Sequence, residues 1–473
     1  MSAQLSYKDL EQKVEYQDMY IEQLHHVIAG LKRDRFGKKS EGFENPFQAQ
    51  LPFQIDETIK DIPEQETELS VTGHKRKKKK RKKRLELPRR IIIVPVSDKD
   101  KLCACGEVKK VVRYEITSRI DFQPATFSVE EERREVVACK NKCNNSIFTA
   151  DLPLRLLPGI NIAESLLAHI IVSKFDDRQP LYHLEQKFYS RYGLDISRSN
   201  MSRWIVESAS PLIPLLNLMK EDITDYDIAS MDATTLQVLN EPGRLATTKS
   251  YVYCFRGGGP KHKPIIYEYN EKNHKAFVKG WFDGFTGYVH SDADSFFNKL
   301  YQQEDVDSAL CHAHARRKFE AIAKTSKKAV LAHHAMQVYR KLYAVEKKAK
   351  QDKLNPDEIK QLRQTHAKPI LESFKAWLES KISLVPPQSP IFKAMRYVLK
   401  NWEGLIRYLE DGRLSIDNNH TEREIKPFVI ARKNLLFAQS QAGARAMALH
   451  FSLIRTAKLH GLDPYRYYVQ IME

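Results

Sequence analysis

Residues 416–434 read IDNNHTEREIKPFVIARKN, and one carboxylate in this stretch, Glu422, stands among basic side chains. These are Arg423, Lys426, Arg432 and Lys433. Carboxylate oxygens bind hard divalent cations, while guanidinium and ammonium groups bind phosphate. The stretch therefore suits a site that binds a metal ion and a phosphate together. A helix here would bring Glu422 to acids supplied by strands earlier in the chain.

Two earlier acids interrupt apolar runs. Residues 228–239 read IASMDATTLQVL, where Asp232 interrupts a run typical of a buried strand. Residues 287–297 read GYVHSDADSFF, where Asp292 ends a second short run. Three carboxylates around one point can hold two divalent cations, which stabilise both oxygens of an in-line phosphoryl displacement.

The alternative for each acid is an ordinary solvated surface group, which is usual in a chain with many charges. The apolar flanks of Asp232 and Asp292 favour burial instead. An unpaired buried carboxylate is costly unless a cation compensates its charge. We therefore predict that Asp232, Asp292 and Glu422 form a catalytic triad that binds two divalent cations.

The chain has 473 residues and a formal net charge of +17 at pH 7. At roughly 100 to 200 residues per domain, this length predicts about three domains and a large core. Ten consecutive basic residues at positions 75–84 supply part of the charge, and the rest is spread over the chain. This distribution suits a polyanionic partner, with nucleic acid ahead of an acidic membrane.

The basic run lies in a polar linker, residues 43–86, and is expected to remain solvated. Such a run is usually only a disordered tail, but it also serves as a sequence-independent phosphate contact that weakens with salt. We predict DNA contact for its members, which are Lys75, Arg76, Lys77, Lys78, Lys79, Lys80, Arg81, Lys82, Lys83 and Arg84.

The sequence also predicts the compartment. Six cysteines are too few for a disulfide scaffold in a chain of this size. No apolar stretch of about 18 residues occurs, and the N-terminus MSAQLSYKDLEQK lacks the layout of a signal peptide. We expect a cytoplasmic protein with no membrane partner.

Residues 1–42 contain an apolar stripe with alternating steps of four and three residues. Its members are Leu10, Val14, Gln17, Ile21, Leu24, Ile28 and Leu31. This period is typical of a coiled-coil seam, in which the polar Gln17 would weaken the seam and fix its register. The alternative is an amphipathic helix packed on its own protein. We predict self-association through this helix.

Residues 87–152 are predicted to form a small zinc-binding domain. Cys103 and Cys105 form one close pair, Cys139 and Cys143 form another, and a segment with strand-like alternation separates them. Four thiolates on two turns would complete a tetrahedral structural zinc site. The alternative is four unrelated buried thiols. The two remaining cysteines, Cys254 and Cys311, are interpreted as core residues.

Residues 153–222 have a helical pattern with a turn around Gly193. The helix after this turn is capped by Ser197 or Ser199 and carries Arg198 and Arg203. A helix-turn-helix of this size can lay its second helix in a major groove, so both arginines are candidate DNA contacts. The alternative is a helical hairpin that never touches DNA, since Met201, Trp204 and Ile205 also make a good core face.

Residues 223–473 alternate between strand-like and helical patterns. Strands are expected at 228–239, 250–255, 264–269, 287–291 and 308–311, with helices at 273–282 and 295–303. This order is that of a ribonuclease-H-like mixed sheet, in which the first and fourth strands are neighbours. A charged helical insertion is expected from about 318 to 405, and a final helix from 442 to 460.

Residues 311–319 read CHAHARRKF, which has the composition of a metal site at Cys311, His312 and His314. The adjacent Arg316, Arg317 and Lys318 would repel a cation and suit a phosphate better. We therefore interpret Arg316 and Arg317 as DNA contacts.

The chain resembles the bacterial insertion-sequence transposases of family sixty-six, within the DDE superfamily, over nearly its whole length. The motifs are RFGKKSE at 35–41, the cysteine pairs, KFDDRQPLYHLE at 174–185, MDATTLQVL, GYVHSDADSFF, CHAHARRKF, IDNNHTEREIKPFVIARKNLLFA at 416–438, and TAKLHGLDPYRYY at 456–468. Three departures stand out: the first cysteine pair is C-x-C, His312 replaces a usual aromatic, and Ala233 replaces a frequent acid. None of them falls on the acidic triad.

The resemblance implies a ribonuclease-H-like fold, Asp232, Asp292 and Glu422 as catalytic residues, and two Mg²⁺ or Mn²⁺ ions. It implies cleavage and joining of transposon ends to target DNA by a nucleoid-associated enzyme, with accessory proteins encoded by the same element. Arg423, Lys426 and Arg432 would hold the scissile strand. Two alternatives stay open: a zinc-containing DNA-binding regulator, and a ribonuclease-H-like nuclease that hydrolyses without joining.

Overall fold

The computed structural model describes residues 91–101, 103–104, 107–115, 125–138, 147–271, 274–294, 297, 300–325 and 328–473. The heptad stripe and the basic run lie outside these residues, so both stay predictions. The chain divides into two compact units, Lys39–Phe127 and a larger one made of Met1–Lys38 and Ser128–Glu473. No helix among the described residues is long and apolar enough to span a membrane.

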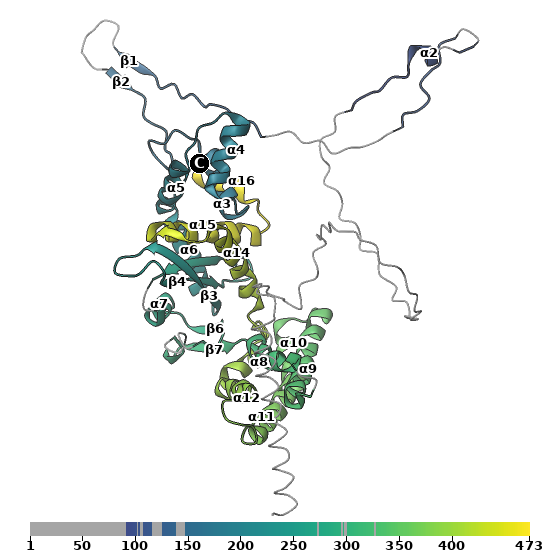
Figure 1. Cartoon of the computed structure of the whole chain (residues 1–473), viewed down its shortest axis with the longest axis vertical. Helices are drawn as coiled ribbons and strands as arrows, with labels where there is room; N and C mark the ends of the chain where they lie inside the picture. Colours follow the sequence, from purple (N-terminus) through teal and green to yellow (C-terminus); the bar gives the residue numbers. More distant parts are fainter. Residues whose placement is uncertain are drawn as a thin grey trace, which may run out of the picture. The chain divides into compact units, whose positions relative to one another are not determined.

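A mixed sheet forms the centre of the larger unit (Figure 1). Its strands follow the order β5-β4-β3-β6-β7, and β8 pairs with the far end of β3. The strands are β3 (Ile228–Asn240), β4 (Lys249–Arg256), β5 (Ile265–Asn270), β6 (Gly287–Ser291), β7 (Val306–Leu310) and β8 (Ala438–Ser440).

Two kinds of connection produce this order. Strands β3, β4 and β5 follow one another as antiparallel neighbours. Helix α7 (His274–Trp281) then separates β5 from β6, and β6 joins the other side of β3 in parallel. A parallel pairing needs such a crossover, because the chain must return to the same end of the sheet. The expected neighbourhood of the first and fourth strands is confirmed. The expected helix over 295–303 is wrong in its described part, which holds a 3-10 turn, Leu300–Gln302.

Helix α15 (Gln441–Leu459) lies across the sheet and also contacts a group of shorter helices, of which α6 packs on the sheet as well (Figure 1). The aromatic side chains of Tyr267, Phe428 and Phe451 pack together at this interface. Buried Ser452 accepts a hydrogen bond from the backbone N–H of Tyr267 (2.8 Å). The shorter helices are α3 (Glu164–Phe175), α4 (Leu181–Tyr192), α5 (Arg198–Glu207), α6 (Ile213–Thr224) and α16 (Pro464–Met472).

Helices α4 and α5 form the predicted helical hairpin. Gly193 ends α4 in the left-handed conformation, and the side chain of Ser197 caps α5 by accepting from the N–H of Asn200 (3.3 Å). One face of α5 is buried through Met201, Trp204 and Ile205. Arg198 and Arg203 lie on its exposed face, so DNA contact by α5 remains a prediction.

The helical insertion has a core of its own, in which Phe319, Tyr339 and Phe374 pack together. Its described elements are α8 (His312–Thr325), α9 (Val330–Asp352), α10 (Pro356–Leu362), a π-helical turn (Arg363–Ala367), α11 (Lys368–Ile382), α12 (Pro390–Lys400), α13 (Trp402–Ile406) and a 3-10 turn (Arg407–Leu409). Buried Arg363 pairs with Glu346 and donates to two carbonyl groups, which satisfies its charge within this core.

The predicted zinc ligands are only partly described. Cys103 is exposed, and Cys105, Cys139 and Cys143 lie outside the described residues. Strands β1 (Val136–Ala138) and β2 (Ile147–Thr149) pair antiparallel, and the second cysteine pair falls between them in the sequence. The zinc site and the domain boundaries therefore stay predictions.

Candidate active site

The two aspartates of the predicted triad lie side by side because their strands run parallel. Ser230 of β3 is opposite His290 of β6. Asp232 and Asp292 each follow these residues by two positions, so they share one level and one face of the sheet. The two carboxylates also interact electrostatically, because the negative charge of Asp292 raises the pKa of Asp232.

Helix α14 (Asn419–Leu435) brings the third acid, Glu422, in its first turn. The residues before Glu422 fasten the start of the helix to β3. The side-chain amide of Asn418 donates to the carbonyl of Met231 (2.8 Å), and the hydroxyl of Thr421 donates to that of Ser230 (2.9 Å). Because Met231 precedes Asp232, these bonds fix the position of Glu422 relative to that acid.

Burial sets the electrostatics of the acids. It raises the pKa of Asp232 to about 7, and the charges of Asp292 and Glu422 act in the same direction. Burial also raises the pKa of Asp292, with a further contribution from Glu422, while His314 opposes the shift. Adjacent carboxylates of like charge favour a bound cation, which removes both their repulsion and the cost of their burial.

Two basic side chains of α8 contact Glu422 directly. The guanidinium of Arg317 donates to one carboxylate oxygen (2.5 Å). The Nδ1 atom of His314 lies 3.6 Å from the other oxygen. Both atoms of this second pair are buried, and neither has a hydrogen-bond partner among the described residues. His314, which the sequence interpretation set aside, therefore belongs to the site.

The structure does not bring together the three residues considered for a metal site, Cys311, His312 and His314. Buried His312 contacts the carbonyl of Leu405 (2.7 Å) and is engaged in the core of the insertion. Ligand atoms of Cys311, His314 and Glu422 instead lie within 4.8 Å of one another. The sulfur of Cys311 accepts from the N–H of Asn418 (3.2 Å), and burial raises its pKa to about 12. A protonated thiol is a poor ligand, so the carboxylates are the better match for a hard divalent cation.

The basic residues predicted to contact DNA occupy different surroundings. Arg423 and Lys426 are exposed on α14. Arg432, on the same helix, donates to the side chains of Thr234 (3.2 Å) and Thr235 (2.8 Å) and so ties α14 to β3. Arg316 pairs with Glu320 (3.4 Å) and is largely buried. Arg432 and Arg316 thus have partners within the protein, and their DNA contacts stay predictions.

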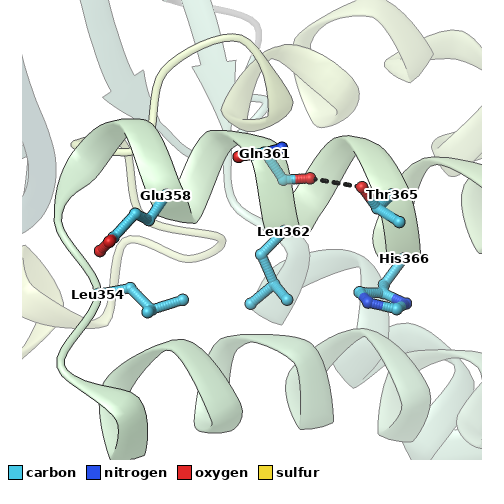
Figure 2. A pocket seen from close by; sticks show the side chains of 6 residues that line it. All are labelled: Leu354, Glu358, Gln361, Leu362, Thr365 and His366. Atoms are coloured by element: carbon cyan, nitrogen blue, oxygen red, sulfur yellow. Dashed lines mark hydrogen bonds between the residues drawn. The ribbon is translucent and has the colours of Figure 1, made fainter.

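A shallow pocket in the insertion is separate from this chemistry (Figure 2). It is lined by Leu354, Glu358, Gln361, Leu362, Thr365 and His366. The hydroxyl of Thr365 is used locally, because it donates to the carbonyl of Gln361 (2.9 Å). The pocket contains none of the three acids of the predicted triad.

These features define a class of protein: an α/β protein in which two strands of a mixed sheet and helix α14 bring three acids together. A family model described as "Transposase IS66 family" matches residues 159–446, which include all three acids. A second, described as "Transposase C of IS166 homeodomain", matches residues 23–92. The chain therefore belongs to the IS66 family of transposases, whose members are DDE-type transposases that act on DNA.

Similar chains occur in Sinorhizobium fredii. The uncharacterized protein y4jD is 28% identical over 99% of this chain and 94% of its own length. The uncharacterized protein y4qI is 30% identical over 94% of this chain and 84% of its own length. Both resemble the chain along nearly its whole length and carry no assigned activity in their names.

Proposed function

We propose that this protein is a ribonuclease-H-like DNA transposase that cleaves the ends of its insertion sequence and joins them to target DNA with divalent metal ions. The observation that carries the proposal is the parallel register of β3 and β6, in which Ser230 and His290 are partners and Asp232 and Asp292 each follow two residues later. The Asn418 and Thr421 bonds add Glu422 to the same place. Three acids from three elements suit a phosphoryl-transfer site.

In this mechanism, Asp232, Asp292 and Glu422 would hold two Mg²⁺ or Mn²⁺ ions, which would supply activation of the attacking water or DNA 3′-hydroxyl and stabilisation of the leaving oxygen. Basic side chains of the protein bind the DNA strand. Arg423 and Lys426, exposed on α14, bind its phosphates.

Arg317 has two roles in this mechanism. Its guanidinium pairs with Glu422, which offsets the charge of that partly buried carboxylate. The same guanidinium is partly exposed, so it can also donate to a phosphate oxygen of bound DNA. Charge-assisted hydrogen bonds of this kind stabilise the negative charge of a phosphoryl transition state. His314 lies beside this pair on α8, with its Nδ1 atom 3.6 Å from the other oxygen of Glu422.

A strand-transfer assay tests the proposal. The substrate is a pre-cleaved duplex carrying the terminal inverted repeat that flanks the reading frame, and the target is a supercoiled plasmid. We expect joined products with Mg²⁺ or Mn²⁺ and none with a chelator. Hydrolysis without joining would favour the nuclease. Binding of the duplex without either product would favour the regulator.

Self-association is the second part of the proposal, because joining requires two ends to be held together. We expect the double variant Ile21→Glu, Leu24→Glu to reduce the molecular mass in light scattering and to prevent paired-end complexes. Charges at a coiled-coil seam remove its apolar contact. The matched control is Gln23→Glu with His25→Glu, which changes the same helix outside the stripe. If the double variant forms paired-end complexes as well as the parent does, another part of the protein must hold the two ends together.

A further inference from the structure

Helix α14 ends in a strained turn. Leu436 has φ of 65° and ψ of −56°, and the N–H of Phe437 donates to the carbonyl of Leu435 (2.9 Å). This is the γ-turn with positive φ, which is rare and strained, and a bulky residue in that region is a genuine outlier. Such strain persists only where the surroundings fix the backbone on both sides.

Both sides of this turn are fixed to β3. Before it, Arg432 of α14 donates to the side chains of Thr234 and Thr235. After it, β8 pairs in parallel with β3, with Ala438 opposite Val238. The turn is therefore fastened to β3 on both sides. It joins α14, which carries Glu422, to β8, which pairs with the strand that carries Asp232.

The turn presents two apolar side chains to solvent. Leu436 is 66% exposed and Phe437 is 45% exposed. Single exposed apolar residues are ordinary on protein surfaces, but an adjacent pair held outward by a strained backbone indicates a contact.

The surface that leads to the turn is basic. Arg423, Lys426 and Lys433 are exposed on α14 and recur at helical spacing, so they form one stripe from the turn of Glu422 to the γ-turn. Arg445, near the start of α15, is also exposed. A basic stripe that ends in an apolar pair matches DNA, whose phosphates bind the cations and whose base stack accepts apolar wedges.

We propose that Leu436 and Phe437 form a wedge that inserts into the base stack of the bound DNA end. Leu436 lies fourteen residues beyond Glu422. At 1.5 Å per residue this is about 21 Å along the helix, which corresponds to roughly six base pairs. The wedge therefore unstacks the duplex about six base pairs from the scissile phosphate. This inference rests on the proposed function, since it requires that α14 lie along a DNA end.

The test uses 2-aminopurine, whose fluorescence rises when it is unstacked. One probe at a time is placed along the first ten base pairs of the terminal duplex. The full-length parent should increase fluorescence near the sixth position. Phe437→Ser should lose this increase and slow strand transfer roughly tenfold, the order expected for loss of one aromatic stacking contact.

Two further variants and one further substrate serve as controls. Leu436→Gly keeps the left-handed turn and removes only a side chain, so it should weaken the signal without altering the fold. Leu245→Ser changes an apolar residue that is 77% exposed in another turn and should behave like the parent. A duplex with mismatched bases near the sixth position should restore strand transfer by Phe437→Ser, because its bases are already unstacked.

The outcomes separate this inference from the proposed function. If the parent joins DNA but no position becomes fluorescent, or if Phe437→Ser behaves like the parent, the wedge proposal is wrong. The proposed transposase function is unaffected by either result. If Phe437→Ser instead lowers the molecular mass in light scattering, the pair is a contact between copies of the chain and the wedge is again wrong. A parent that neither cleaves nor joins contradicts the proposed function itself.

Discussion

Asp232→Asn, Asp292→Asn and Glu422→Gln are each expected to abolish cleavage and strand transfer, with losses of about a thousandfold or more. Each change removes one negative charge from a site built to hold divalent cations. Binding of the terminal duplex should remain nearly parental, because the phosphates are bound by basic side chains such as the exposed Arg423 and Lys426, which the substitutions leave in place. Strand transfer on a pre-cleaved end and a gel-shift titration measure the two properties.

Asp294→Asn is the matched control for this set. Asp294 lies two residues from Asp292 and contacts it through its backbone N–H (3.3 Å), which the substitution leaves in place. We expect this variant to retain most of the activity. Full activity in any one of the three triad variants would remove that residue from the catalytic site.

The same substitution at Asp232 should also stabilise the protein. The pKa of Asp232 is raised to about 7, mainly by burial, from an ordinary value of 3.8. A folded pKa above the unfolded one means that ionisation destabilises the fold, so stability falls as pH rises between these values. In chelator at pH 8, Asp232→Asn should therefore raise the free energy of unfolding, by up to about 4 kcal/mol. Urea unfolding measures this change, and a less stable variant would mean that Asp232 has a structural role.

The arrangement of the sheet could be predicted because it follows from local rules. Three strands in succession form antiparallel neighbours, and a helical crossover then returns a parallel strand to the first one. The adjacency of Asp232 and Asp292 is a consequence of that order. Apolar flanks also favour burial of both acids, and the structure leaves each of them only partly exposed.

The contacts of the third acid could not be predicted, since they depend on distant segments. The pairing of Glu422 with Arg317 joins residues 105 positions apart. The insertion between them builds a separate core, and nothing in the local pattern shows how that core orients α8. The C-x-x-H spacing of Cys311 and His314 was the available signal for His314. The neighbouring arginines were interpreted as repelling a cation, whereas one of them neutralises Glu422.

Two other contacts show the same limit. The position of Arg432 in a basic helix predicts a DNA contact, which stays a prediction, but it gives no sign of the hydrogen bonds that Arg432 makes to threonines of β3. Arg363 has no distinguishing pattern in a charged insertion, yet it is buried against Glu346 and two carbonyls. Sequence shows that a residue is basic, but only the packing of remote elements decides whether that charge faces solvent.

The pH dependence of activity is expected to report the ionisation of Asp232. At a Mg²⁺ concentration below saturation, strand transfer should rise about tenfold per pH unit between about pH 5 and pH 7, and then level off. The cause is competition between a proton and a cation for one carboxylate, whose pKa burial raises to about 7. At saturating Mg²⁺ the midpoint should move to lower pH, because a bound cation favours the ionised form.

Arg317→Met sharpens this test. The positive charge of Arg317 lowers the pKa of Asp232, so its removal should move the midpoint at low Mg²⁺ to higher pH. Lys324→Met is a matched control, since Lys324 is an exposed cation of the same helix that pairs with Glu320 (3.1 Å). It should leave the midpoint unchanged. A parental midpoint below about pH 5 at low Mg²⁺ would show that an acid of ordinary pKa controls the reaction, and Asp232 would then not be the carboxylate that limits cation binding.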